Sequence, residues 1–409
     1  MIRRVKEAGN RRQILGFDAN IFWMGMTSFF TDFSTEMIYP LIPVFVVSVL
    51  NASAASLGVI EGIAESTAAL TRVASGYISD RLRIRKPLAV IGYLLPCVAK
   101  PFLAIAQTPV HVGLVRFTDR LGKGIRVAPR DALLATSADR KHFGKAFGFH
   151  RLMDNLGAAV APLAAVLLLA IFQVSKNPDH LRPIFIIAGA VGLIGVYFLW
   201  MNVEERVPER KADAGGRPAG PRLTFADLPP RYKVFLLGTI VFSLANSSDM
   251  FLILKAQSVG VALVAIPLLY FTMNMVYSLV SYPAGVISDR IPRLPIITAG
   301  MAVYAVTYFS MGRATTALAV WLLFALYGVY NALTEGVGKA LVADLVDDER
   351  RAFAYGLQYT ASGVCLLPAS LLMGFLWKIA GHQVAFTVDA VLALAGAVVL
   401  LIGFRMTKR

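Results

Sequence analysis

The stretch GYISDR, residues 76–81, returns almost unchanged as GVISDR at residues 285–290. A second pair has a similar separation along the chain, because STEM at residues 34–37 corresponds to SSDM at residues 247–250. A third, AFG at 146–148, corresponds to AYG at 354–356. Repeated segments at one spacing indicate an internal duplication. The sequence therefore predicts two related halves, each following the same order of elements.

The composition identifies the solvent of these halves as lipid. Of the 409 residues, 57% are hydrophobic and only 16% are charged, too few to coat a soluble protein of this size. Apolar stretches of about 20 residues, the length that crosses a hydrocarbon core as a helix, occur again and again. The alternation of a β-barrel is absent. We predict an all-α integral membrane protein with the lipid bilayer as its surroundings.

The apolar periodicity predicts twelve transmembrane helices. A polar segment rich in Gly and Pro at 204–230 separates the sixth helix from the seventh and is typical of a linker. We therefore expect a six-helix bundle at 1–203, a cytoplasmic linker at 204–230 and a second six-helix bundle at 231–409. The predicted helices cover 17–49, 56–79, 87–107, 109–135, 144–174, 181–203, 232–258, 261–288, 294–312, 315–343, 351–378 and 382–404.

The distribution of Lys and Arg predicts the orientation, because cytoplasmic loops carry the positive excess. Basic residues gather in alternate connections and at both termini, whereas the other turns carry few apart from Lys176, Arg182 and Arg313. Both ends of the chain are thus expected in the cytoplasm, with the protein in the cytoplasmic (inner) membrane. The first apolar segment is too long for a cleaved signal peptide and has no cleavage pattern.

Several other functions fit the sequence poorly. The basic residues behind the net charge of +15 lie between apolar segments and at the chain ends rather than on one soluble surface, so nucleic-acid binding is not expected. Gly122-Lys123 and Gly338-Lys339 lack the rest of a P-loop, which excludes an ATP-driven pump. The five histidines are scattered and the two cysteines lie far apart, so we expect no catalytic site, metal site or cofactor. A channel or a receptor of the same architecture is an alternative. We expect a monomer.

The connection after the second helix resembles the signature of the major facilitator superfamily, Gly-x-x-x-Asp-Arg-x-x-Arg-Arg/Lys, with one extra residue between its basic pairs. The resemblance implies a secondary transporter with two pseudo-symmetric six-helix bundles. It also implies that this connection is a conformational latch, although a topological anchor would need the same charges. The latch residues are Gly76, Asp80, Arg81, Arg85 and Lys86, with Gly285, Asp289 and Arg290 in the second copy.

The fifth helix resembles the antiporter signature of the same family through Gly148, Gly157 and Pro162. Ala161 and Ala165 replace its last two glycines, and residues of this size still allow close helix packing. The resemblance implies export of the substrate in exchange for another solute or ion.

Ionisable residues at membrane depth are candidate functional groups because burying a charge in lipid is costly. On the fourth helix the charged residues fall within an arc of about 140°, which gives this helix one cationic face. Acidic residues on the first and second helices are expected to neutralise much of it. In the family the first, fourth, seventh and tenth helices line the cavity, so the repeat-related Glu36 and Asp249 would face it from opposite halves.

We therefore expect Glu36 and Asp249 to be the proton-coupling acids, with Asp32 and Glu335 in reserve, unless they form permanent salt bridges. The expected function is proton-coupled export of a small organic solute, anionic or drug-like. The alternative is uptake or exchange of an organic anion, such as a carboxylate metabolite or siderophore. The candidate cavity residues are Arg116, Asp119, Arg120, Lys123, Glu61, Glu65, Asn246, Asn274, Asn331, Lys339 and Tyr359.

Overall fold

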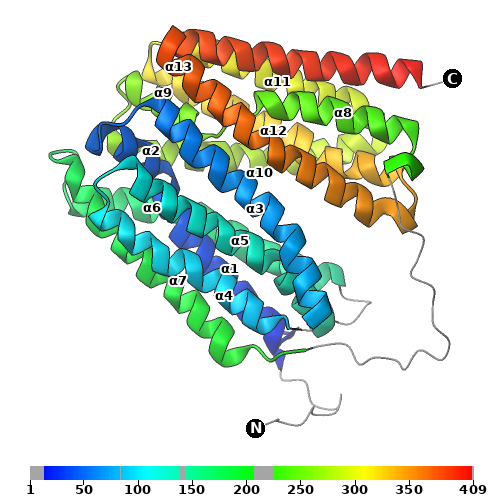
Figure 1. Ribbon diagram of the computed structural model, residues 1–409, viewed down its shortest axis with the longest axis horizontal. Helices are drawn as coiled ribbons and strands as arrows, with labels where there is room; N and C mark the ends of the chain where they lie inside the picture. The colour runs from blue at the N-terminus through cyan, green and yellow to red at the C-terminus, as the bar shows by residue number, and fades with distance from the viewer. Residues whose placement is uncertain (1–12, 83, 139–142, 207–224, 408–409) are drawn as a thin grey trace.

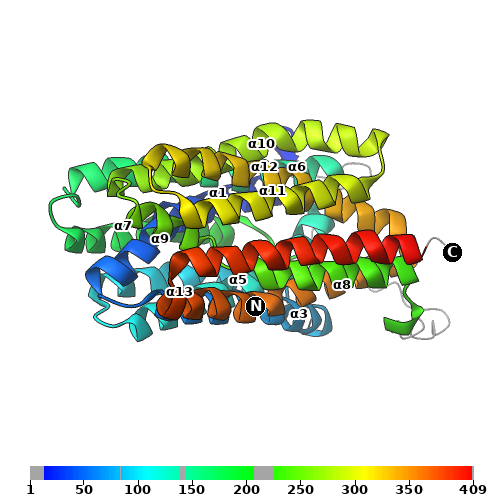
Figure 2. The same ribbon diagram turned by 90° about the horizontal axis from the view of Figure 1, so that it is seen from above.

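The computed structural model describes residues 13–82, 84–138, 143–206 and 225–407. Long helices dominate, and most run along one common axis (Figure 2). A two-stranded hairpin precedes the first helix, and Asp18 at its end caps that helix by accepting a hydrogen bond from the Asn20 amide. The helix expected from residue 17 therefore begins two residues later, because Phe17 pairs with Ile14 in the hairpin.

The amino-terminal half contains the six helices expected from the sequence. Prolines Pro40 and Pro43 interrupt the regular hydrogen bonding of the first one, which continues as short 3₁₀, α and π segments. The elements are β1 (Gln13–Ile14), β2 (Phe17–Asp18), α1 (Ala19–Ile38), η1 (Tyr39–Leu41), α2 (Ile42–Val44), η2 (Phe45–Val49), α3 (Ala54–Leu82), α4 (Lys86–Ala99), η3 (Lys100–Ile105), α5 (Pro109–Ser137), α6 (Phe143–Ile171), η5 (Pro178–Leu181) and α7 (Arg182–Asn202).

The carboxy-terminal half follows the same order with two irregularities. The helix expected at 232–258 breaks at residues 246–249, where Asn246 leaves the helical conformation. The last two expected helices join into α13, within which Gly381 has a positive φ of 82° and marks the bend. The elements are η6 (Phe225–Asp227), α8 (Pro230–Ala245), α9 (Met250–Ser258), η7 (Leu263–Ala265), α10 (Ile266–Arg290), α11 (Arg293–Arg313), α12 (Ala317–Leu345) and α13 (Asp348–Met406).

Nine helical segments of the described chain are long and apolar enough to cross a membrane. One of them, Phe353–Met406, is 54 residues long and contains the bend at Gly381. Helices α3 and α5 are 29 residues long each and carry the charged residues described below. The protein is therefore a helical membrane protein, while the count of twelve crossings and the cytoplasmic location of both termini stay predictions.

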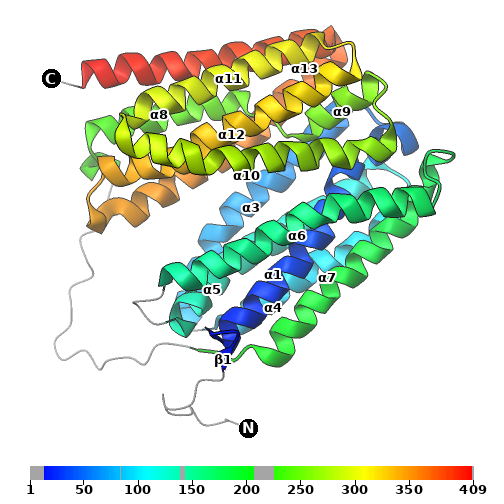
Figure 3. The same ribbon diagram turned by 180° about the vertical axis from the view of Figure 1, so that it is seen from behind.

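The two halves meet mainly at one end of the molecule. We call the end where α1 begins, α7 ends, α8 begins and α13 ends the terminal end. In Figure 1 the halves converge at the end opposite to the terminal end, and α2 lies beside α9 at this convergence. Helix α3 packs on α13, and α6 packs on α10 (Figure 3). Backbones approach so closely that a Cβ added at Gly58 would overlap the carbonyl oxygen of Ser370.

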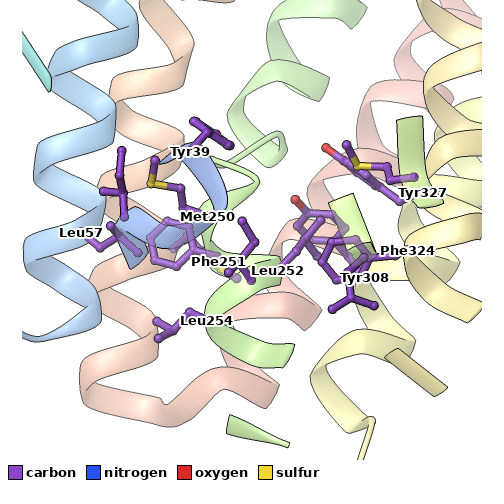
Figure 4. Close-up of a cluster of buried hydrophobic side chains, with 14 of the residues drawn as sticks. Tyr39, Leu57, Met250, Phe251, Leu252, Leu254, Tyr308, Phe324 and Tyr327 are labelled. Atoms are coloured by element: carbon purple, nitrogen blue, oxygen red, sulfur yellow. The ribbon is translucent and has the colours of Figure 1, made fainter. Parts of the chain in front are cut away.

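Apolar side chains from both halves form one continuous core at this convergence. Figure 4 shows Leu57 and Tyr39 of the amino-terminal half beside Met250 and Phe251 of the carboxy-terminal half. Toward the terminal end, the space around several glycines of α6, α10, α12 and α13 is open, because an added Cβ there would meet no atom within 4 Å. The halves are thus closed at the opposite end and separate toward the terminal end.

The glycine and proline motif of the fifth expected helix, which is α6 in the structure, is closely packed at Gly157 and open at Gly148. Gly157 lies against the backbone of Phe29 in α1, and a Cβ at this position would overlap its carbonyl oxygen. Pro162 lies within α6, between the buried alanines Ala161 and Ala165. Gly148, nearer the terminal end, faces open space. Close packing of α6 on α1 therefore rests on Gly157.

Candidate functional site

Helix α5 places Arg116 and Arg120 beside the acids of α3. The guanidinium of Arg116 binds Glu61 through two parallel hydrogen bonds, Nε to Oε1 at 2.7 Å and Nη2 to Oε2 at 2.8 Å. Both side chains are almost completely buried, with 3% and 0% of their surface exposed. The guanidinium also lies 5.5 Å from the ring centre of Tyr39. A charge-assisted, bidentate pair in such surroundings is strongly coupled.

One turn further along α5, Arg120 pairs with a second acid of α3. Its Nε lies 2.6 Å from Oε1 of Glu65, whose side chain is 28% exposed. Asp119 stands between the two arginines, 3.4 Å from Arg116 Nη1 and 3.5 Å from Arg120 Nη1. The expected neutralisation of the cationic face by α3 is therefore present, and only part of the positive charge remains for a solute.

Glu36 on α1 lies close to these charges without pairing with any of them. Within the described part of the chain it makes no hydrogen bond or ion pair, and its side chain is half-buried. It interacts electrostatically with Asp32, Lys123 and the two arginines of α5. Lys123 likewise makes no ion pair with a described residue. Asp32 has a long contact of 3.5 Å with Arg126, which lies over the ring of Tyr93 at 4.3 Å.

Asp249 occupies the corresponding place in the other half, at the break between α8 and α9. Tyr327 of α12 donates a 2.6 Å hydrogen bond from its hydroxyl to Asp249 Oδ1. A cluster of tyrosines surrounds this contact, with Tyr304 and Tyr308 of α11 stacked at 4.0 Å and Tyr330 at 5.2 Å from Tyr327. Like Glu36, Asp249 is half-buried and makes no ion pair with a described residue.

An aromatic contact joins the two halves between these acids. The rings of Tyr39 and Tyr270 lie 5.4 Å apart, one from each half. Tyr270 interacts electrostatically with both Glu36 and Asp249. In the same way, Asp249 interacts with Glu61 and Glu65 across the halves. The repeat-related acids, predicted from the sequence to face one cavity, thus belong to one group of interacting side chains.

Glu335 lies apart from this group, at a more exposed contact between the halves. It accepts hydrogen bonds from Lys339 Nζ at 2.9 Å and from the Tyr277 hydroxyl at 2.7 Å. Arg151 of α6 approaches it to 3.7 Å from the other half. Glu335 thus has two positive partners, Lys339 and Arg151.

The remaining cavity candidates contribute less to this group. Asn246 lies at the helix break with a buried oxygen that has no hydrogen bond among the described residues. Asn274 and Asn331 are half-buried on α10 and α12. Tyr359 is 43% exposed, with Arg72 6.0 Å from the centre of its ring.

The expected latch residues make their described contacts within their own halves. Arg85 Nη1 donates to the carbonyl oxygen of Ala132, and the amides of Arg85 and Lys86 both donate to Glu205 at the start of the linker. Arg81 contacts Tyr77, and Gly76 lies against α5 at Ala128. The side chain of Asp80 lies outside the described structure. Asp289 lies 3.7 Å from Arg293. Gly285 faces open space and Arg290 is exposed.

Three buried charged residues were missed in the sequence, Lys100, Asp389 and Lys255 of α9, and the first two lie beside the repeated motif. Lys100 in η3 donates hydrogen bonds to the hydroxyls of Ser34 and Thr35 at 2.7 and 2.9 Å, next to Glu36. Asp389 in α13 is completely buried and accepts a 2.8 Å hydrogen bond from Ser247, next to Asp249. Each is a single charge in an otherwise apolar segment, the signal that could have found them. Among the described residues no cluster of His, Cys, Asp or Glu is arranged to hold a metal ion.

The bundle and the charged group at its centre define a class of protein, the multi-pass membrane transporters built from two related halves. The sequence matches the model of the Major Facilitator Superfamily over residues 24–254 and again over 234–409. The chain belongs to this family, and it is a transporter of small molecules rather than an enzyme.

Relatives in sequence agree with this assignment. An uncharacterised transporter of the same type from Methanocaldococcus jannaschii is 35% identical over 98% of this chain and all of its own length. The multi-drug resistance efflux pump PmrA of Streptococcus pneumoniae is 25% identical, over 34% of this chain and 35% of the pump.

Solved structures share the fold at low identity. The nucleoside transporter NupG superposes with a TM-score of 0.75 at 14% identity, covering 94% of this chain and 99% of its own. A bacterial homologue of the human lysosomal transporter Spinster, inward-facing and occupied, gives 0.75 at 15%, covering 94% and 96%. These likenesses concern the fold alone.

Proposed function

We propose that this protein exports a small organic solute across the cytoplasmic membrane in exchange for protons. The protein acts as a monomer. Its two halves, residues 1–203 and 231–409, move relative to each other, and the segment 204–230 links them. Glu36 and Asp249 carry the protons. The observation that carries the proposal is that these two repeat-related acids, one from each half, lie half-buried in one charged group without a basic ion-pair partner in the described structure.

Both protonation states of such an acid are accessible. The carboxylate of Glu61 is already bound to Arg116 through two hydrogen bonds. Glu36 has no such partner, and burial makes its charged form costly. Binding of a proton and binding of a solute near Lys123 and Arg120 can therefore compete, which couples the two flows.

The contacts between the halves support alternating access. If the terminal end is cytoplasmic, as the distribution of basic residues predicts, this conformation opens inward and is closed outside by the apolar core around Leu57 and Phe251. The contacts of Arg81 and Arg85 with described residues then lie within their own half, as an open inner side requires. Closure there would bring α3 and α6 toward the second half.

The surroundings of the acids favour an amphiphilic solute. Tyr39, Tyr270 and Tyr327 offer aromatic faces with polar edges, while Glu36 and Lys123 offer one charge of each sign. The likeness to the efflux pump PmrA over a third of the chain supports export.

An organic anion is the second candidate, favoured by Lys123. Its ammonium makes no ion pair with a described residue, so it is available to a carboxylate. The pairing of Arg116 and Arg120 with Glu61 and Glu65 weakens this alternative, since those two cations are already neutralised.

Transport by purified protein in liposomes tests the proposal. An imposed pH gradient is expected to drive accumulation of the solute in wild-type liposomes, while Glu36→Gln and Asp249→Asn abolish it. Both variants should retain exchange of labelled for unlabelled solute, which needs no net proton movement. The substrate is first found by thermal-shift screening of metabolite and drug libraries, in which bound solutes raise the melting temperature.

Asp179→Asn is the matched control, because Asp179 is an exposed acid at the opposite end whose one ion pair with a described residue is the contact with Arg182. It should transport like the wild type. Gradient-driven accumulation by both Glu36→Gln and Asp249→Asn would refute the assignment of the proton to these acids. Accumulation of organic acids alone would favour the second candidate.

A further inference from the structure

The break between α8 and α9 covers a buried acid that the coupling scheme above does not use. Asp389 of α13 is 0% exposed, and its Oδ2 accepts a 2.8 Å hydrogen bond from the hydroxyl of Ser247. Its other oxygen, Oδ1, is buried without any hydrogen-bond partner in the described structure. No basic side chain of the described residues lies within 4 Å to form an ion pair with it.

Comparison of the two repeats shows that this acid is specific to one half. Ser34 and Ser247 occupy the same position of the repeated motif, and each contacts a residue behind its helix. Ser34 accepts a hydrogen bond from the buried Lys100 and donates one to the carbonyl oxygen of Ala188. Ser247 instead donates to Asp389. The acceptor of this serine hydroxyl is thus a backbone carbonyl oxygen in one half and a buried acid in the other.

An ionised Asp389 would be much more costly here than a neutral one. One hydroxyl donor does not replace the water around a carboxylate, and the neighbouring Tyr304 and Tyr308 carry no positive charge. Tyr304 donates its hydroxyl to the carbonyl oxygen of Ala245 rather than to the acid. A proton bound to Asp389 would remove this cost.

The helix break gives this proton a route to the cavity. Asn246 leaves the helical conformation, and Ser247 and Ser248 precede Asp249, which is half-buried. Tyr308 interacts electrostatically with both Asp249 and Asp389, so it lies near both acids. Broken helices in transporters expose backbone groups that bind coupling ions. Movement of this short segment would place the Ser247 side of Asp389 in contact with water.

We propose that Asp389 is a second proton-binding site in the carboxy-terminal half, which releases its proton to the cavity when the α8–α9 break rearranges during transport. The release breaks the O–H bond at Asp389, leaves a carboxylate stabilised by Ser247 and water, and passes the proton to that water. This inference rests on the proposed proton coupling and adds a site to it.

Other titratable groups face this region and enter any pH dependence. Asp249 lies at the break, Lys255 lies buried on α9, and the tyrosines lie on α11 and α12. His382 directly follows the bend of α13 at Gly381. Arg313 of α11 donates a hydrogen bond to Thr387 of α13. Within the described structure these bases form no ion pair with Asp389, so none of them replaces its proton.

The Asp389→Asn variant separates a working proton site from a permanently neutral group. Asparagine keeps the shape and a hydrogen-bond acceptor for Ser247, so a permanently protonated acid would be replaced without loss. If the proton must leave, pH-driven accumulation falls to the level of protein-free liposomes, while the melting temperature and solute exchange are retained. Reversal potentials of Asp389→Glu, which keeps the acid, should show the wild-type number of protons per solute.

The same measurements keep this inference distinct from the coupling scheme. Wild-type transport without any response to pH refutes the proposed function. A pH-coupled wild type with a fully coupled Asp389→Asn variant refutes only the second site. Accumulation driven by a sodium gradient and lost in Asp389→Asn would also overturn the assignment, because the ligand would then be a metal cation. If this variant does not fold, Ser247→Ala decides: the pH midpoint of transport must shift, and an unchanged midpoint refutes the site.

Discussion

The buried pair of Arg116 and Glu61 makes a sharp prediction about stability. In Glu61→Ala the guanidinium of Arg116 stays 3% exposed, and its remaining partners among the described residues are Asp119 at 3.4 Å and the ring of Tyr39. Breaking a buried ion pair by removing one partner costs about 3–5 kcal/mol. With roughly 1–2 °C per kcal/mol for a chain of this size, the melting temperature should fall by about 3–10 °C.

Thermal unfolding in detergent, followed by size-exclusion chromatography of heated samples, measures this fall. Glu65→Ala is the matched control, because Glu65 is 28% exposed and water can replace it beside Arg120. Its effect should be clearly smaller. The double variant Glu61→Met, Arg116→Met removes both charges and should recover most of the loss. A melting temperature of Glu61→Ala within about 1 °C of the wild type would show that the pair does not hold α3 to α5.

Three further predictions concern the contacts that place the halves. Gly58→Leu should separate α3 from α13, because even a Cβ would overlap the Ser370 carbonyl oxygen. Maleimide labelling of a cysteine at position 57, in a background without native cysteines, should then rise. Unchanged labelling would contradict the close contact. Arg151→Ala should change the free energy of unfolding by less than about 1 kcal/mol, since its pair with Glu335 is exposed; a larger loss in thermal unfolding would mean that this contact holds the halves together. Asp18→Ala removes the cap of α1 and an ion pair with Arg206, so the free energy of local opening at the first turn of α1 should fall by about 1–2 kcal/mol. Amide hydrogen exchange in this turn should become correspondingly faster. Exchange at the wild-type rate would rule out the cap.

Much of the helical order could be predicted from the sequence because lipid imposes a simple condition. Every crossing must be apolar for about 20 residues and must satisfy its own backbone, so helix ends fall near the predicted positions. The departures have local causes. Prolines at 40 and 43 disturb the end of the first helix, and the polar segment 246–249 interrupts the seventh. Neither changes the hydropathy enough to be seen in a window of that length.

The candidate site was only partly predictable. The repeat singled out Glu36 and Asp249, because equivalent positions in related halves face the same axis. The helical period placed Arg116 opposite acids of the second helix, and the pair with Glu61 followed this expectation. Lys100 and Asp389 escaped, since no motif contains them and their partners, Ser34 and Ser247, are distant in sequence.

The sequence by itself determined that this protein lies in lipid, that it consists of two related halves, and which faces of its helices are charged. These properties follow from local hydropathy and periodicity, which each segment carries alone. Only the tertiary structure decided which charges neutralise each other, which acids remain unpaired, and at which end the halves meet. Those outcomes depend on distances between segments far apart in the chain, and the energy of a buried charge changes steeply with whether a partner lies within reach.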